Sequence, residues 1–394
     1  MRILHTSDWH IGKRIGRYDR TDEYREALDQ VQAIAEEHDV DLVVVSGDLF
    51  DRPTPPTETL GMAMEALRRL ADDGRRPVVA IAGNHDSPEL FEVLAPYLRP
   101  LGVHLVGDIR RPDAGGVIEV ETAAGPAVVA CFPFLREGRV VDFMQDVGGW
   151  YGAYQERVGG IFGAYGRALE PHMRRAVTIL TAHVAVPGVT IGGRELGRGE
   201  RELHIGETYM ASAAALPSVA HYVALGHIHA PQKVPGTGTF QAEYAGSLLP
   251  LDFGEAGEQK RVVVVTAEAG GAVQVQSVPL HAGRPLLHIE GTWDEIVARR
   301  DDLKDGYLDL VVSTPGPDPS LATRAADLFP YVVKVRASYP EAQRQREHRT
   351  GRPWRDLYAE FHEQKRNVAA PAPLLDAFDE VHVAAQDEAI DAPA

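Results

Sequence analysis

The segment RILHTSDWHIG, residues 2–12, decides the fold: a short apolar strand is followed at once by Asp8 and His10. The segment DLVVVSGDLFD, residues 41–51, repeats this arrangement with a nearly continuous apolar run. Such a run is typical of a strand buried on both faces. Between the two segments, residues 21–38 carry apolar side chains at helical spacing. Strand–helix–strand repetition predicts a layered α/β fold.

Three later apolar segments also end in polar side chains. They lead into GNHD at residues 83–86, a single His183, and GHIH at residues 226–229. Each motif alone has an ordinary explanation, such as a turn, a cap or a surface histidine. Five of them in this order favour one shared site, because ligand sites assemble at the carboxyl ends of strands in open α/β sheets. Carboxylate, amide and imidazole groups suit Mn²⁺, Fe²⁺ or Zn²⁺, and the lack of thiolates argues against structural zinc.

The bulk composition is that of a globular protein, with 394 residues, 44% of them hydrophobic and 25% charged. At roughly 100–200 residues per domain, two or three structural units are expected. No run approaches the ~20 apolar residues that cross a bilayer, so no membrane segment is expected. The N-terminus has no signal-peptide pattern. The lone Cys131 excludes an internal disulfide framework and fits a reducing compartment, so we expect a cytoplasmic protein.

The net charge of −17 argues against a polyanionic partner, but the charge is unevenly distributed. Residues 11–20 carry four cations against the single anion Asp19. The cations are Lys13, Arg14, Arg17 and Arg20. A solvated surface loop and a phosphate-binding loop both explain such a cluster, and the charge alone does not decide between them.

The chain beyond the motifs divides into further parts. Residues 286–339 alternate short strands and helices and predict a compact α+β module. Residues 354–367 and 373–386 have helical spacing, with apolar stripes along one side of each. The stripes are Trp354, Leu357, Tyr358 and Phe361, and Leu374, Leu375, Phe378 and Val381. We therefore expect a main domain at 1–281, a small domain at 282–340 and a helical tail at 341–394.

Together the five motifs resemble the calcineurin-like metallophosphoesterase superfamily. Within it, residues 6–12 and 47–51 resemble the SbcD family, the nuclease subunits of bacterial SbcC–SbcD complexes. The similarity extends over most of the chain. It implies a layered α/β/β/α metallophosphoesterase sandwich with a small α+β capping, DNA-binding domain at 282–340 and a C-terminal helical, partner-binding tail at 341–394.

The resemblance also implies a role for each residue of the site. Two divalent metal ions, with Mn²⁺ the expected ion, would be bound by two ligand sets that share one bridging carboxylate. The first set is Asp8, His10 and His229, the second is Asn84, His183 and His227, and Asp48 is the bridge. His85 would act on the phosphate without binding metal, and the Asp51 carboxylate would orient it. A turn cap is the alternative role for Asp51.

Three functions compete at this point. The first is a metal-dependent DNA exonuclease and endonuclease that hydrolyses phosphodiesters by two-metal in-line attack, acting in double-strand break repair. The second is a metallophosphoesterase for small phosphate esters or phosphoproteins. The third is an inactive scaffold. All predicted ligands and His85 are present, which disfavours the scaffold. Arg52-Pro53 follows Asp51 where protein phosphatases of the superfamily typically have Arg-Gly. The nuclease is therefore the leading hypothesis.

Partners follow from the same resemblance. The chain has no Gly-x-x-x-x-Gly-Lys-Ser/Thr motif, so any dependence on ATP must come from a second protein. The family implies an SbcC-type ATPase whose coiled coil contacts the C-terminal helices. It also implies a homodimer of this chain within a heterotetramer, with DNA as the substrate.

Overall fold

The computed structural model describes most of the chain. The described residues are 1–136, 154–191, 194–195, 211–238, 240–339, 353–366, 368–379 and 381. By internal packing they form two compact units. The first comprises Met1–His288, Asp301–Asp309 and Pro330–Val333, and the second comprises Ile289–Arg300, Leu310–Phe329 and Lys334–Ala394. The division at residues 281 and 340 stays a prediction.

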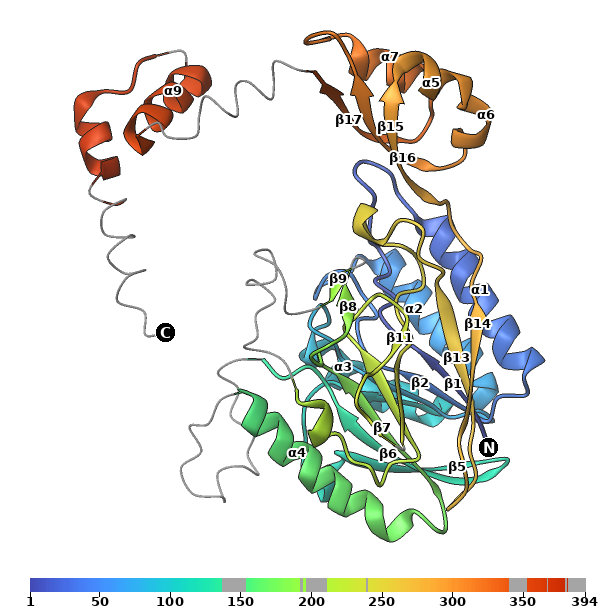
Figure 1. Cartoon of the computed structure of the whole chain (residues 1–394). Coiled ribbons are helices and arrows are strands. Elements are labelled where there is room, and N and C mark those ends of the chain that lie inside the picture. Colours follow the sequence, from blue (N-terminus) through green and yellow to red (C-terminus); the bar gives the residue numbers. More distant parts are fainter. Residues whose placement is uncertain are drawn as a thin grey trace. The chain divides into compact units, whose positions relative to one another are not determined.

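The first unit contains two six-stranded mixed sheets (Figure 1). The first sheet has the order β14 (Gln274–Pro279), β13 (Arg261–Thr266), β1 (Arg2–Thr6), β2 (Leu42–Val45), β3 (Val78–Ile81), β4 (Val103–Val106). The second has the order β11 (Gln232–Lys233), β12 (Gln241–Tyr244), β10 (Tyr222–Gly226), β7 (Val177–His183), β6 (Gly125–Phe132), β5 (Val117–Thr122). Strands β1 to β4 run parallel, as do β6, β7, β10 and β12.

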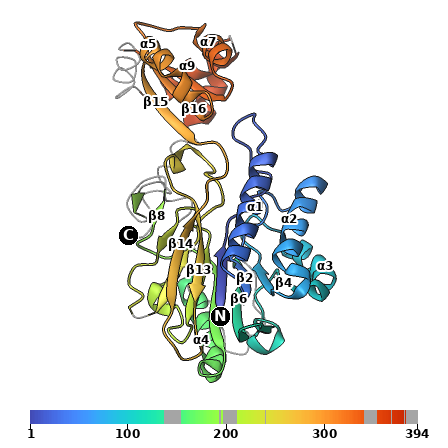
Figure 2. The ribbon, with the colours of Figure 1, turned by 90° about the vertical axis from the view of Figure 1, so that its right-hand side faces the viewer.

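Helices cover the outer faces of these sheets. Helices α1 (Thr21–Glu37), α2 (Thr57–Leu70) and α3 (Pro88–Leu98) lie together on one side of the first sheet (Figure 2). Helix α4 (Tyr154–Leu169) packs on the second sheet, where Phe162 contacts Phe132 of β6 edge to face. The arrangement is the α/β/β/α sandwich, so the predicted fold class is confirmed.

Strand β2 shows why the sandwich forms. All four of its side chains are fully buried. Val43 and Val45 pack with the helices, whereas Leu42 and Val44 face the layer between the sheets. Because side chains alternate along a strand, a run that is apolar throughout must be covered on both faces. The interpretation of residues 41–46 as a doubly buried strand is therefore confirmed.

A three-stranded sheet of order β15-β16-β17 follows the sandwich. Its strands are β15 (Leu286–Thr292), β16 (Tyr307–Ser313) and β17 (Val332–Ser338). The helices of this part are α5 (Trp293–Ala298), α6 (Arg300–Leu303) and α7 (Leu321–Leu328). A short pair, β8 (Thr190–Ile191) and β9 (Arg194–Glu195), lies after β7. The alternating strands and helices predicted for residues 286–339 are thus present, and their separation as a module stays a prediction.

Helix α9 (Trp354–Arg366) is the first helix of the tail, and residues 372–379 are also helical. Tyr358 and Phe378 stack with ring centroids 4.3 Å apart, so the two helices pack on each other. The rest of the predicted second helix, residues 380 and 382–386, lies outside the described residues. Among the described helices, none combines the length and apolar character required to cross a bilayer.

Candidate metal centre and its surroundings

Five parallel strands deliver the candidate side chains at their carboxyl ends. In chain order, β1 leads to Asp8 and His10, β2 to Asp48, β3 to Asn84 and His85, β7 to His183, and β10 to His227 and His229. Since the strands of each sheet are parallel here, their carboxyl ends share one edge. The structure brings all these residues together, as their order at strand ends predicts.

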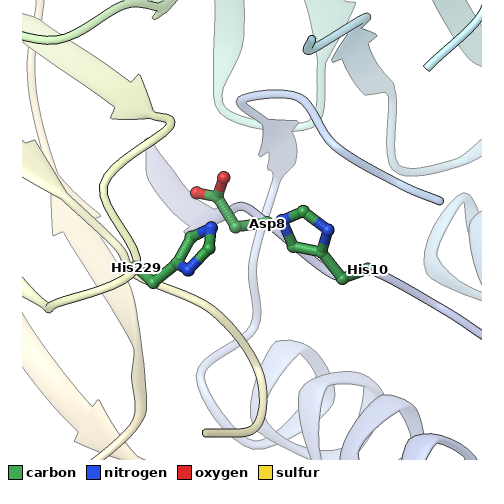
Figure 3. A group of neighbouring side chains, drawn as sticks. All are labelled: Asp8, His10 and His229. Atoms are coloured by element: carbon green, nitrogen blue, oxygen red, sulfur yellow. The ribbon is translucent and has the colours of Figure 1, made fainter. Parts of the chain in front are cut away.

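Asp8, His10 and His229 form one group of possible ligands (Figure 3). Each offers one ligand atom, and the three atoms lie within 4.8 Å of one another. The main-chain N–H of His227 donates to both Asp8 carboxylate oxygens, at 3.1 and 3.2 Å, which orients the carboxylate. This group has the same members as the first predicted ligand set.

Asn84, His183 and His227 form a second group. The Asn84 Oδ1 atom lies 2.9 Å from His183 Nε2 and 2.9 Å from His227 Nδ1. The His183 Nδ1–H donates to the Ser46 carbonyl at 2.8 Å, which leaves Nε2 as the nitrogen that faces the group. All three side chains of the second predicted ligand set therefore converge on one point.

Asp48 lies between the two groups. Its Oδ2 atom is 3.5 Å from His10 Nε2 and 3.4 Å from His183 Nε2. Its Oδ1 atom accepts a hydrogen bond from the main-chain N–H of His85 at 2.8 Å. One carboxylate oxygen thus faces a nitrogen from each ligand set.

The backbone at the site is strained. Asp8, His10, Asp48 and His227 have φ values of 49°, 46°, 52° and 95°, in a region that side chains other than glycine seldom adopt. Strain of this kind costs on the order of 1–3 kcal/mol per residue and concentrates at functional sites. Close approach adds a requirement for glycine: a Cβ atom on Gly83 would lie 2.1 Å from Asp48 Oδ1.

Charges within the site shift several pKa values. Burial raises the pKa of Asp8, with His183 and His229 opposing the shift. Burial alone would also raise the pKa of Asp48, but His183 and then His10 hold it well below its usual range. Burial would lower the pKa of His183, yet Asp48 raises it to about 9. A cation bound here would therefore compete with the proton on His183.

His10 provides the test of whether the site fits metal ions. Its side chain is buried, and neither ring nitrogen has a hydrogen-bond partner within the described part of the chain. Buried nitrogen atoms normally find a partner, so an unpaired imidazole beside two carboxylates needs a further ligand. Oxygen and imidazole donors without thiolates suit Mn²⁺, Fe²⁺ or Zn²⁺. The donor set therefore fits divalent metal ions.

His85 lies beside this group, with its ring centroid 4.7 Å from that of His10. Its Nδ1–H donates to the main-chain carbonyl of Asp51 at 3.0 Å. The Asp51 carboxylate instead pairs with Lys13, at 3.1 Å from Nζ. Asp51 is thus next to His85 as expected: the hydrogen bond runs through its carbonyl, and a carboxylate oxygen also lies within 4.8 Å of ring nitrogens of His10 and His85. Orientation of His85 by the Asp51 carboxylate stays a prediction.

Asp86 is a part of the site to which the motif gave no role. Its buried carboxylate accepts hydrogen bonds from the main-chain N–H groups of Leu49, Phe50 and Gly83, at 3.2, 3.0 and 2.9 Å. Burial, and then the charge of Asp48, raises its pKa to about 7. Asp86 holds together the two loops that carry Asp48 and the Asn84-His85 pair.

Glu255 is a second unpredicted residue of the site. Its Oε1 accepts a hydrogen bond from His229 Nδ1–H at 2.8 Å, and its Oε2 is 2.7 Å from Lys260 Nζ. Lys260 also donates to the His229 carbonyl at 3.0 Å. A carboxylate on one ring nitrogen fixes the tautomer and leaves Nε2 available for a metal. Glu255 lies 26 residues after His229, and no spacing in the sequence marks it.

A pocket of about 490 Å³ opens at the site. Its lining includes Asp48, Asn84, His85, His227 and His229, together with Glu255. The lining places His85 and ligands of both sets on the same cavity.

The comparisons with known proteins agree with this geometry. Residues 1–231 match the calcineurin-like phosphoesterase family, a range that contains all five strand ends. The chain belongs to the calcineurin-like phosphoesterase family. The superfamily resemblance predicted from the motifs is confirmed, and the phosphoesterase is a hydrolase.

The phosphoesterase is similar along most of its length to curated bacterial proteins. It is 30% identical to the SbcD subunit of the SbcCD nuclease of Bacillus subtilis over 381 residues, which cover 94% of this chain and 95% of that protein. It is 32% identical to the SbcD protein of Rhodobacter capsulatus, over 77% of this chain and 76% of the relative. The SbcD protein of Escherichia coli K12 is 28% identical, over 80% and 78%. The predicted resemblance to the SbcD family is confirmed.

Proposed function

We propose that the chain is a metal-dependent DNA nuclease that hydrolyses phosphodiester bonds during the processing of DNA double-strand breaks, in the compartment that holds the DNA. The observation that carries the proposal is the convergence of two ligand sets on either side of Asp48, in a chain similar to nuclease subunits over 94% of its length. Cleavage of linear duplex DNA in Mn²⁺, compared with hydrolysis of para-nitrophenyl phosphate, tests it.

The two ligand sets support a pair of Mn²⁺ ions as the cofactor. Asp8, His10 and His229 would hold one ion, and Asn84, His183 and His227 the other, with Asp48 shared. Such a pair supplies Lewis-acid charge to the attacking and leaving oxygens of an in-line displacement. The protein contributes the fixed orientation: the hydrogen bonds to Asp8 and Asp48 and those made by His183 and His229 hold their side chains in place.

His85 supplies the proton transfer. Because its Nδ1–H is bound to the Asp51 carbonyl, Nε2 is the nitrogen available to the phosphate in the pocket. A protonated histidine placed there can give its proton to the leaving oxygen as the bond to phosphorus breaks. Asp51 acts in this account as a positioning residue through its carbonyl, with its carboxylate bound to Lys13.

The loop at residues 11–20 supports contact with the DNA backbone through three of its four cations. Lys13 lies beside Asp51, and Arg14 and Arg17 are exposed. Arg20 is different: it is buried, pairs with Glu23 at 2.9 Å, and donates to the Pro250 carbonyl at 2.6 Å. The interpretation of Arg20 as a phosphate contact is therefore wrong, because its charge is already neutralised inside the protein.

Replacement of Lys13, Arg14 and Arg17 by Gln is expected to weaken DNA binding equally for all sequences. In a plot of the logarithm of the binding constant against the logarithm of the salt concentration, the slope should become shallower by about 0.9 per lost phosphate contact. Fluorescence anisotropy across a salt series measures it. Arg20→Gln is the matched control, expected to lower thermal stability and leave the slope unchanged. An unchanged slope in the triple variant contradicts the assignment.

The tail supports docking of an SbcC-type ATPase. Arg355 pairs with Asp376 at 2.7 Å and also with Asp379, which reinforces the Tyr358–Phe378 stack between the two helices. Trp354 and Phe361 remain 60% and 55% exposed on α9. Exposed aromatic residues on an amphipathic helix suit helix-in-groove binding to a partner such as a coiled coil.

Replacement of Trp354 and Phe361 by Ala is expected to weaken ATPase binding by about 30-fold or more for each side chain, since buried aromatic anchors are typically worth about 2 kcal/mol or more each. Deletion of residues 341–394 should abolish binding and leave metal content unchanged. Surface plasmon resonance measures the affinity. Val368→Ala, which alters an equally exposed apolar side chain between the helices, should bind normally. Full affinity in the double variant places the interface elsewhere.

The exposed face of α3 supports a homodimer within the larger complex. Val93 and Tyr97 lie one turn apart and are 63% and 76% exposed, and Leu101 after the helix is 39% exposed. A cluster of this kind favours burial against another protein surface, here a second copy.

A Tyr97→Glu variant is expected to sediment as a monomer at micromolar concentration where the natural chain sediments as a dimer, because dimerisation would bury the new charge. Analytical ultracentrifugation measures this. Val381→Glu, at an apolar side chain that is 69% exposed, is the control and should remain dimeric. A natural chain that is monomeric, or a dimeric Tyr97→Glu variant, argues against this interface.

A further inference from the structure

The layer between the two sheets is mostly apolar, and a group of polar side chains crosses it beneath the candidate metal centre. The layer is built of side chains such as Ile3, Val44 and Ile179. Among the buried polar residues are four that we call the inter-sheet chain: His5, Ser46, Thr181 and Tyr222. Two belong to the first sheet, at β1 and the end of β2, and two to the second, on β7 and β10.

These four side chains form a continuous hydrogen-bonded path across the layer. The Tyr222 hydroxyl is 2.9 Å from His5 Nδ1, and His5 Nε2 is 3.0 Å from Ser46 Oγ. Ser46 Oγ is also 3.0 Å from Thr181 Oγ1 and donates to the Ala224 carbonyl at 3.2 Å. Ser46 thus joins the first sheet to two strands of the second.

The donor and the acceptor of the hydrogen bonds along the path from Tyr222 to Ser46 can be assigned. Burial, and then the charge of Arg261, lowers the pKa of His5 to about 3 against the opposing effect of the Leu225 carbonyl, so the ring is neutral. Since the Ser46 hydroxyl donates to a carbonyl, its oxygen accepts from His5 Nε2–H. His5 Nδ1 then accepts from the Tyr222 hydroxyl. Each donor is matched by an acceptor, as buried polar groups require.

The path ends at the metal centre through the main chain of Ser46. The Ser46 carbonyl accepts from His183 Nδ1–H at 2.8 Å and from the Ser7 hydroxyl at 3.1 Å. The bond from His183 orients its ring so that Nε2 faces Asn84 Oδ1 at 2.9 Å and Asp48 Oδ2 at 3.4 Å. A displacement of the Ser46 carbonyl would therefore turn the His183 ring.

We propose that the inter-sheet chain positions His183: Tyr222, His5 and the Ser46 hydroxyl hold the Ser46 carbonyl in place, and this carbonyl holds His183 Nε2 at the second metal position. The inference rests on the proposed function, because it assumes that the site binds two metal ions. Partners behind a metal-binding histidine typically change metal affinity by about 10–100-fold when they are removed. The first metal position has its own ligand set of Asp8, His10 and His229, to which His183 does not belong.

The test compares Tyr222→Phe and Ser46→Ala with the natural chain. Each variant removes one hydroxyl and keeps the rest of the side chain and the Ser46 carbonyl. The control is Thr178→Val, on the same strand as Thr181, because Thr178 is equally buried and its hydroxyl bonds to Val219 O and His221 away from the site. Calorimetric titration of the metal-free full chain with Mn²⁺ alone gives the affinity of each position, and thermal unfolding gives the stability.

Both test variants should lose about 10–100-fold in Mn²⁺ affinity at the second position and keep the natural affinity at the first. Thr178→Val should lose stability without losing metal affinity. The Ser46→Ala/Tyr222→Phe double variant should lose less metal-binding free energy than the sum of the losses in the two single variants, because both side chains act through His5. Natural affinity at both positions in the test variants, or an equal loss in Thr178→Val, overturns the proposal. A natural chain that binds no Mn²⁺ instead overturns the proposed metal centre and the positioning role with it.

Discussion

Replacement of Asp48 by Asn is expected to weaken both metal positions together. Its Oδ2 atom lies 3.5 Å from His10 Nε2 and 3.4 Å from His183 Nε2, so it contributes charge to both ligand sets. Loss of this shared charge should lower affinity at each position by more than the about 10–100-fold that indirect partners contribute. Metal content by mass spectrometry after dialysis, and affinity by calorimetric titration, measure the effect. Nuclease activity should fall below detection.

Asp8→Asn is the matched comparison for Asp48→Asn. Asp8 is equally buried, and it lies within 4.8 Å of His10 and His229 and also of Asp48 and His183, but the predicted assignment gives it to the first ligand set alone. Its replacement should weaken one position and leave the second occupied. If Asp48→Asn also keeps one position full, Asp48 is not shared, and the assignment of a bridging carboxylate is wrong.

Replacement of His85 by Gln is expected to keep both metal ions and DNA affinity while lowering the turnover number by about 10²–10⁴, the usual contribution of general acid–base catalysis. His85 lines the pocket together with Asp48 and Asn84. Its Nδ1–H donates to a main-chain carbonyl, so this nitrogen is not expected to bind a metal ion. Single-turnover cleavage of duplex DNA, with metal content measured on the same sample, separates chemistry from binding.

Asp51→Asn is the control for His85→Gln. The substitution removes the carboxylate that pairs with Lys13 and keeps the carbonyl that orients His85. It should reduce turnover far less than His85→Gln. Equal losses in the two variants would show that the carboxylate matters more than the carbonyl contact. Loss of metal together with activity in His85→Gln would make His85 a ligand.

The convergence of the candidate ligands could be predicted because the order of strands and the residues at their ends are visible in the sequence. Apolar runs that end in Asp8, Asp48, Asn84, His183 and His227 place polar groups at one edge of each sheet, and the two sheets face each other. The doubly buried strand β2 implied the layered core for the same reason. Both predictions used the spacing of apolar residues and the order of the motifs along the chain, which can be read directly from the sequence.

Contacts between distant segments could not be predicted in this way. The burial of Arg20 depends on Glu23 and on the Pro250 carbonyl, 230 residues away, so a count of cations in residues 11–20 misjudged it. The bond from His85 to Asp51 involves a main-chain atom, which every residue has, so residue type carries no signal for it.

The groups behind the ligands were missed for a related reason. Glu255 stands behind His229 and Ser46 behind His183, and both are common residue types with no repeating interval to their partner. Their roles become visible only when hydrogen bonds are assigned in three dimensions. Indirect partners of this kind hold ligands in orientation, so their absence from the motif does not make them minor.

Cleavage of linear duplex DNA in Mn²⁺ tests the central claim most directly. The natural chain and His85→Gln would be incubated with duplex DNA and with para-nitrophenyl phosphate, with and without a chelator, and with and without an SbcC-type ATPase. The account predicts metal-dependent cleavage of DNA that falls by about 10²–10⁴ in His85→Gln. Intact duplex DNA under all conditions, with rapid metal-dependent hydrolysis of para-nitrophenyl phosphate, would contradict it and identify an enzyme for small phosphate esters.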